Sequence, residues 1–225
     1  MQVVSVINQK GGAGKSTLSI HLAVAAAQKG QNVALIDLDG QATAAEWGDR
    51  RDEELPVVVS CHASRLQREL EDVRGSGGEL VFIDTVPRSD AVALDAARAS
   101  DLVIIPCEPN ILEVAPTITT VGLLRTTKTP FIVVLNKVAF NGVEADDAEA
   151  YLKSEHHIPV SPARVHTRKA FWRAITAGQG VTEYEPDGKA AEELQHLHEL
   201  VRAHLHTTTR AATRSTTEEK AHAQH

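Results

Sequence analysis

The sequence has few aromatic residues, no long apolar run and no excess of basic charge. Aromatic side chains make up 4% of its 225 residues, so a core must be built mainly from Val, Ile, Leu and Ala. No apolar run approaches the roughly 18 residues that a membrane-spanning helix needs. The first residues lack the basic region and apolar stretch of a signal peptide, so we expect a protein that is neither secreted nor membrane-spanning.

Cysteine content and net charge indicate the compartment of the protein and the kinds of partner it can bind. Cys61 and Cys107 lack the spacing of a metal site and suggest a reducing compartment, although one pair does not exclude a disulfide. The formal net charge of −7 argues against a protein that binds nucleic acid over its whole surface, but it leaves a local basic patch open. At this length we expect one domain, or one domain with a small appendage.

The first half of the chain alternates short apolar segments with helical patterns. Residues 16–30 have apolar positions on one helical face, and Gly30 suits the C-terminal cap of that helix. Near-continuous apolar strands that alternate with helices are typical of a parallel sheet covered on both faces. We therefore predict an α/β fold with a mostly parallel twisted sheet and helices on both faces. The predicted strands are 3–7, 33–36, 80–83, 102–105 and 131–135.

The rest of the chain is mostly helical in pattern, with helices predicted over residues 146–154, 167–177 and 189–204. After His206 the sequence contains six threonines and no Val, Ile, Leu, Phe or Trp. Such a segment cannot bury enough apolar surface to offset the entropy lost on ordering. We therefore predict a single domain over residues 1–205 and a disordered tail over residues 206–225.

The strongest motif lies between the first predicted strand and the first predicted helix. Its glycines allow a tight turn that points backbone N–H groups at phosphate oxygens, and the amino end of the helix adds partial positive charge. Lys15 can reach the β- and γ-phosphates, and the Ser16 hydroxyl can ligate magnesium. The motif predicts a P-loop. The residues expected to bind nucleotide are Lys10, Gly11, Gly12, Ala13, Gly14, Lys15, Ser16 and Thr17.

An additional lysine, Lys10, makes this motif resemble the deviant Walker A sequence of the ParA/MinD family of ATPases. The resemblance covers roughly residues 2–205 and implies a P-loop NTPase fold that binds ATP and magnesium. It also implies that Lys10 crosses a dimer interface to the nucleotide of the partner, where its charge stabilises the transferring phosphoryl group. Lys10 and Lys15 are both expected to be catalytic on this basis. The alternative for Lys10 is a solvated loop lysine.

Three aspartates follow two of the predicted strands and resemble acidic residues of the same family. Alternation along the strand places Asp37 and Asp39 on the same side of the chain. The resemblance implies that Asp39 is catalytic and positions or activates the attacking water. It implies that Asp37 and Asp84 support the magnesium ion together with Ser16. The alternative for the first two aspartates is that they end a strand and cap a helix over residues 41–50.

One more residue resembles the family, and two positions differ from the family's usual sequence. Asn136 ends the strand over residues 131–135, where the family places an asparagine against adenine, and a turn asparagine at a strand end is an equal alternative. Gly40 stands where the family usually has proline. Val86 precedes Pro87 where the family usually has two prolines.

Basic residues gather next to two aromatic residues in the C-terminal part of the chain. In the family this region contributes to non-specific DNA binding by the ATP-bound dimer, and phosphate contacts from Lys and Arg need no base readout. Dimerisation doubles such a patch. The alternative is a solvated helix face. The residues expected to contact DNA are Arg164, Arg168, Lys169, Arg173 and Lys189.

The sequence is most similar in type to the short ParA proteins. The resemblance implies a cytoplasmic ATPase, nucleoid-associated when ATP-bound, that forms a homodimer and segregates or positions a plasmid, chromosome or large cargo. A centromere-binding or cargo-adaptor protein is expected to stimulate its slow hydrolysis. Two alternatives stay open: an enzyme that uses ATP to activate a small carboxylate substrate, and a MinD-like ATPase on a membrane. The acidic last helix and the lack of apolar anchors after it argue against a membrane.

Overall fold

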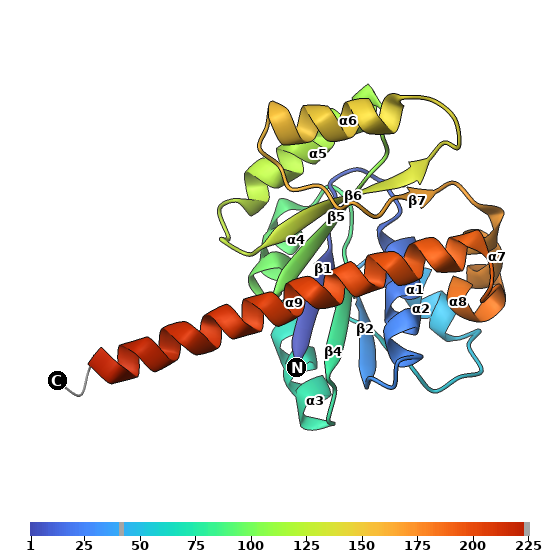
Figure 1. The fold of residues 1–225 in the computed structure, drawn as a ribbon. Coiled ribbons are helices and arrows are strands. Elements are labelled where there is room, and N and C mark those ends of the chain that lie inside the picture. Colours follow the sequence, from blue (N-terminus) through green and yellow to red (C-terminus); the bar gives the residue numbers. More distant parts are fainter. Residues whose placement is uncertain (41–42, 223–225) are drawn as a thin grey trace.

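The computed structural model describes residues 1–40 and 43–222. Within them, seven strands form one sheet in the order β3-β2-β4-β1-β5-β6-β7 (Figure 1). Each neighbouring pair of strands in this order is parallel. The strands are β1 (Gln2–Val6), β2 (Val33–Asp37), β3 (Val57–Ser60), β4 (Leu80–Asp84), β5 (Leu102–Cys107), β6 (Phe131–Val138) and β7 (Val165–His166).

The helices lie in two layers, one on each face of the sheet. The first layer packs on a core that includes Val4, Val6 and Leu35. The second layer packs on a core that includes Val3 and Ile36, which are sequence neighbours of those strand residues and point to the other face of the sheet. The first layer contains α1 (Lys15–Ala27), α2 (Thr43–Gly48), α7 (Lys169–Thr176), α8 (Val181–Tyr184) and α9 (Lys189–His222). The second contains α3 (Leu66–Gly75), α4 (Asp90–Arg98), α5 (Ile111–Leu124) and α6 (Glu144–Ser154), and a 3₁₀ turn, Ala63–Arg65, precedes α3.

The two cores follow from the period of the strands. Successive side chains of a strand point to opposite faces, so a strand covered on both faces is apolar at nearly every position. Val3 belongs to one core and Val4 to the other. The predicted fold class, an α/β protein with a parallel sheet and helices on both faces, is confirmed.

The five predicted strands are confirmed, whereas β3 and β7 were not predicted. β3 has four residues, lies at an edge of the sheet, and is half-exposed or exposed along its length. β7 has two residues at the opposite edge. β7 is too short to give the signal of a strand. β3 contains three consecutive valines and is as long as several of the predicted strands, so its pattern was present in the sequence and was missed.

The C-terminal helix is longer than the sequence predicted. Its apolar stripe, which ends at Leu205, is buried against the first core. The backbone then continues as a helix to His222, past the predicted end near residue 204, although a disordered tail was predicted from residue 206. Residues 207–222 contain neither glycine nor proline, so no strong helix breaker interrupts the helix. Figure 1 shows these last turns extending away from the sheet.

Two smaller points complete the fold. The helix that the alternative interpretation placed over residues 41–50 is found as α2, Thr43–Gly48. Residues 41–42 of that predicted helix and residues 223–225 of the predicted tail lie outside the described part of the chain. No helix in the described residues is long and apolar enough to cross a membrane.

Candidate nucleotide site

The predicted P-loop connects the end of β1 to the start of α1. Two of its glycines, Gly12 (φ +80°) and Gly14 (φ +96°), have the left-handed backbone conformation that residues with a Cβ rarely adopt. Gly14 is also the N-cap of α1, and a Cβ on it would lie 2.2 Å from the side-chain amide nitrogen of Asn136. The chain therefore forms a left-handed glycine turn where the motif predicts a phosphate-binding loop.

The site lies at the carboxyl ends of the central strands. Register pairs Val6 of β1 with Asp84 of β4, and Asp84 in turn with Asp37 of β2. β1 has β4 on one side and β5 on the other, so the P-loop leaves the sheet between two later strands. Ligands of open α/β sheets bind at such carboxyl edges, where the strand order reverses. The fold therefore brings Asp37 and Asp84 to the P-loop, as predicted.

Asp84 is a fully buried carboxylate at the end of β4, close to Ser16 and Lys15. Burial raises its pKa to about 7, and the nearby Ser16 hydroxyl and the Lys15 ammonium oppose this rise. Neither carboxylate oxygen makes a hydrogen bond of good geometry within the described residues. A buried charge in this state is costly unless a cation or donor reaches it.

The unsatisfied carboxylate supports a magnesium site. Magnesium prefers oxygen ligands, keeps several waters, and is commonly held by one or two carboxylates plus substrate phosphates. Ser16 supplies a hydroxyl oxygen at the amino end of α1, and Asp84 supplies buried carboxylate oxygens beside it. These residues therefore fit the ion that the motif implies.

Asp37 has a structural role in this structure. Its Oδ1 accepts a hydrogen bond from the backbone of Asp39 at 2.9 Å, and its Oδ2 accepts from Ala44 and Ala45 at 3.0 and 3.2 Å. Burial raises the pKa of Asp37, and these backbone N–H groups oppose the rise. The carboxylate thus caps the start of α2, which was the alternative interpretation of the sequence. Support of the magnesium shell by Asp37 and water activation by Asp39 stay predictions.

Lys15 is buried at the first residue of α1, where the motif predicts it. Its ammonium nitrogen donates to the backbone carbonyl of Lys10 at 3.2 Å. Burial lowers the pKa of Lys15, and the carboxylates of Asp84 and Asp39 oppose this effect. A desolvated lysine with one carbonyl partner is well suited to exchange that partner for a phosphate oxygen.

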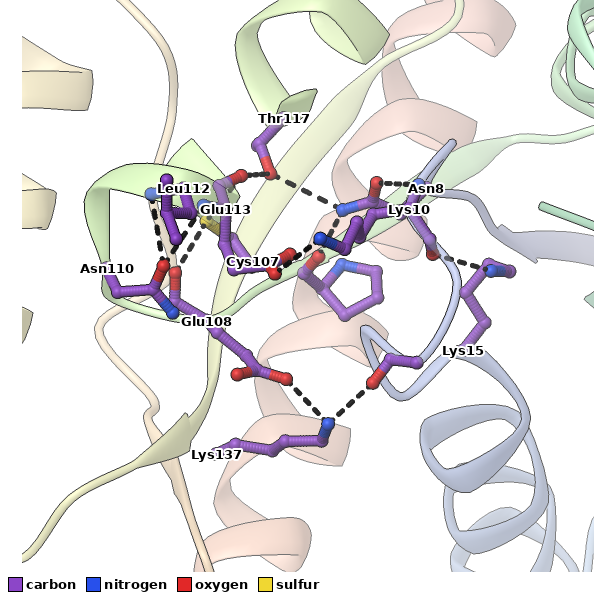
Figure 2. A network of polar contacts seen from close by, with 12 residues as sticks. Asn8, Lys10, Lys15, Cys107, Glu108, Asn110, Leu112, Glu113, Thr117 and Lys137 are labelled. Atoms are coloured by element: carbon purple, nitrogen blue, oxygen red, sulfur yellow. Dashed lines mark hydrogen bonds and ion pairs between the residues drawn. The ribbon is translucent and has the colours of Figure 1, made fainter. Parts of the chain in front are cut away.

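Two residues at the end of β6 contact the P-loop backbone. The Asn136 amide donates to the carbonyl of Ala13 at 2.8 Å, and the Lys137 ammonium donates to the carbonyl of Gly12 at 2.6 Å. Lys137 also pairs with Glu108 at 2.5 Å (Figure 2). The sequence predicted a role for Asn136 but none for Lys137, which follows it, or for Glu108. Contact of Asn136 with adenine stays a prediction.

Lys10 is held by its own chain. Its ammonium lies 3.0 Å from Oε1 of Glu113, in the first turn of α5 (Figure 2). The Asn110 side chain caps the same helix by accepting from the backbone of Leu112 and Glu113. Lys10 is thus a partly exposed loop lysine that is paired within its own chain, and its role at a dimer interface stays a prediction. Glu113 is a residue of this region that the sequence did not indicate.

The basic residues predicted to contact DNA divide into two groups. The first group is paired with acidic residues of the same chain. Arg164 pairs with Asp146 and Glu149. Arg168 pairs with Glu193, and Lys189 pairs with Glu192.

The second group consists of Lys169 and Arg173 on α7. Both are exposed and carry no ion pair within the described residues. Arg173 lies over the ring of Trp172, which is itself 57% exposed. The structure therefore leaves a smaller basic surface than the sequence suggested, centred on α7.

The parallel order of the sheet and the glycine turn into α1 together define the P-loop NTPase class. Residues 4–181 match the family described as the CobQ/CobB/MinD/ParA nucleotide binding domain. The chain belongs to this ParA/MinD family, which confirms the resemblance seen in the sequence.

Relatives and solved structures agree with this assignment. The chain is 35% identical over 198 residues to the Maintenance of carboxysome distribution protein A of Gloeobacter kilaueensis, covering 86% of this chain and 89% of that protein. It is 24% identical to the chromosome-partitioning ATPase Soj of Thermus thermophilus, covering 90% and 96%.

The solved structures show the same fold. MinD of Aquifex aeolicus superposes with a TM-score of 0.73 at 16% identity, covering 90% of this chain and 98% of that one. The ATP complex of a Cyanothece McdA variant superposes with a TM-score of 0.67 at 17% identity, covering 91% and 96%.

Proposed function

We propose that this protein is an ATP-driven positioning switch. It binds ATP and magnesium at the P-loop, closes into a homodimer around the nucleotide, binds DNA without sequence preference, and hydrolyses ATP when a partner protein stimulates it. The observation that carries the proposal is a P-loop with two lysines, Lys10 and Lys15, beside the buried carboxylate of Asp84.

The roles of the residues follow from charge and position. The P-loop N–H groups and Lys15 hold the β- and γ-phosphates. Ser16 and Asp84 would hold magnesium, which screens the phosphate charge when it is bound. Asp39 orients the attacking water for in-line displacement. In this proposal the P-loop binds ATP before the reaction, whereas Asp39 and Lys10 stabilise the transition state of hydrolysis.

Lys10 acts across the dimer interface in this proposal. A cation that reaches the phosphoryl group only after two subunits meet makes hydrolysis depend on assembly, as an arginine finger does. Lys10 is 40% exposed, so its side chain has room to leave Glu113. Dimerisation also duplicates the exposed pair Lys169 and Arg173, which turns a weak phosphate contact into a useful one.

The cargo is proposed from the relatives. The Gloeobacter protein is named for carboxysome distribution, and the Thermus protein for chromosome partitioning. We propose that this chain likewise moves or spaces a large assembly or a replicon over DNA in the cytoplasm, through an adaptor or centromere-binding protein that stimulates hydrolysis.

The test compares the wild type with Lys10→Ala in the presence of ATP and magnesium. Sedimentation should show an ATP-dependent dimer for the wild type and mainly monomer for the variant. Binding of a fluorescent ATP analogue to the monomer should change little, since Lys15 is intact. Lys29→Ala, an exposed lysine just past the far end of α1, is the matched control. Normal dimerisation and normal turnover by Lys10→Ala would contradict the proposed role.

A further inference from the structure

The polar groups of Lys10 are all engaged within its own chain. Its backbone N–H donates to Oδ1 of Asn8 at 2.8 Å, and its carbonyl accepts from Lys15 at 3.2 Å. Its ammonium pairs with Glu113 at 3.0 Å. Figure 2 shows these contacts converging on one residue of the P-loop.

Glu113 is well placed to hold a cation. Its side chain is 14% exposed, so the pair is partly shielded from solvent and salt, unlike an ordinary surface ion pair. The residue lies in the first turn of α5, where the helix dipole favours a negative charge. Both the position and the partial burial of this carboxylate favour its contact with Lys10.

The surroundings fix α5 relative to the P-loop. The Asn8 amide donates to the carbonyl of Pro106 at 2.6 Å and lies 3.4 Å from Oγ1 of Thr117, one turn after Glu113. Thr117 in turn donates to the carbonyl of Glu113 at 2.9 Å. Asn8 therefore ties the start of the P-loop, the end of β5 and the first turns of α5 into one unit.

We infer that Glu113 is a positioning residue that stores Lys10 within its own subunit until nucleotide is bound. The inference rests on the proposed function, because it concerns the same lysine that is proposed to cross the dimer interface. While Lys10 is paired with Glu113, its ammonium is withheld from the partner's nucleotide. Dimer closure therefore requires an exchange in which a phosphate replaces the carboxylate.

The contact between Lys15 and Lys10 links this exchange to nucleotide binding. Lys15 donates to the carbonyl of Lys10 in the nucleotide-free chain. When Lys15 turns to phosphate, that carbonyl loses its donor and residue 10 loses one of its three tethers. ATP binding thus loosens the residue that Glu113 holds, and the ion pair is then the one contact that still restrains the Lys10 side chain, while its backbone N–H stays bonded to Asn8.

The first test measures the pair itself in the absence of nucleotide. Amine acylation read by mass spectrometry reports how accessible and reactive each lysine is. Glu113→Gln should raise the labelling rate of Lys10 by about three- to tenfold, as loss of a partly shielded pair predicts. Glu69→Gln, the same change in the first turn of α3, should leave it unchanged. Equal labelling of Lys10 in wild type and Glu113→Gln would overturn the inference.

The second test measures assembly. The ATP concentration that gives half-maximal dimer should fall by about three- to tenfold in Glu113→Gln, while binding of a fluorescent ADP analogue to the monomer stays the same. The double variant Glu113→Gln/Lys10→Ala should lose this gain, which a general structural effect of the substitution would not do. A midpoint that is unchanged or higher in Glu113→Gln would overturn the storage role.

The two tests separate the inference from the proposed function. If wild type forms no dimer with ATP although Glu113→Gln raises Lys10 labelling, the proposed function fails and the ion pair stands. If wild type forms the dimer but labelling of Lys10 does not respond to Glu113→Gln, the inference fails and the proposed function stands.

Discussion

The side-chain amide of Asn136 donates to the backbone carbonyl of Ala13 at 2.8 Å, although 123 residues separate them in the sequence. Asn136 is buried at the end of β6, and the neighbouring Gly14 has no Cβ that would block this approach. The contact means that the P-loop, which follows β1, is braced by a residue of β6, two strands away in the same sheet.

Asn136→Ala should destabilise the nucleotide-free protein. The substitution removes the buried donor of the Ala13 carbonyl, and an unsatisfied buried acceptor costs about 1–3 kcal/mol. Urea unfolding without nucleotide measures the change in the free energy of unfolding. Asn141→Ala, an exposed asparagine in the loop before α6, is the control. If Asn136 served only to contact adenine, the variant would unfold at the same urea concentration as wild type.

Asp84→Asn should change how stability depends on pH. The folded-state pKa of Asp84 is raised from 3.8 to about 7. Between these values the unfolded state ionises and the folded state does not, so stability falls as the pH rises from about 4 to about 7. The neutral amide removes this loss, and we expect nucleotide-free Asp84→Asn to be more stable than wild type at pH 8 by up to ~4 kcal/mol.

The same variant should lose its response to magnesium. Asparagine keeps the shape of the side chain but removes the charge that would hold the ion. Thermal unfolding with ATP, with and without magnesium, should show a magnesium-dependent shift of the unfolding temperature for wild type and little shift for Asp84→Asn.

The pH prediction has its own contrary outcome. If the stability of wild type relative to Asp84→Asn stayed flat between pH 4 and 8, Asp84 would not be desolvated in solution.

Asp39→Ala should bind ATP and form the dimer, yet hydrolyse ATP slowly. Loss of a group that orients or activates water acts on the transition state, and we expect kcat to fall by about 100-fold or more. A phosphate-release assay and sedimentation with ATP measure the two effects. Asp72→Ala, on the exposed face of α3, is the matched control. Wild-type turnover by Asp39→Ala would move the role to another residue.

Reversing the charge of Lys169 and Arg173 together should weaken DNA binding equally for unrelated sequences. Contacts to phosphate carry no sequence information, and their loss flattens the dependence of affinity on salt. ATP binding should be unchanged. Lys29→Glu/Arg74→Glu changes the net charge by the same amount at exposed positions elsewhere. If both double variants lost affinity equally, the effect would come from net charge and α7 would not be the DNA surface.

The fold class and the phosphate site could be predicted because each depends on local order in the sequence. Apolar strands of four to six residues are visible as runs, and the glycine-rich turn with Lys15 and Ser16 is contiguous. The conformation of Gly12 and Gly14 also follows locally, since a turn with positive φ needs residues without a Cβ. Asp84 could be placed because it directly follows an apolar strand.

What the sequence could not decide are the partners of these residues. Glu113 and Lys10 are about a hundred positions apart, and they meet because β5 lies next to β1 in the sheet. The same holds for Arg164 and Arg168: their charges are visible in the sequence, but their acidic partners lie on α6 and α9. The pair between Lys189 and Glu192 is different, because it forms within one turn of α9. A motif specifies which groups are present, whereas the packing of distant elements determines which of those groups are already bound to one another.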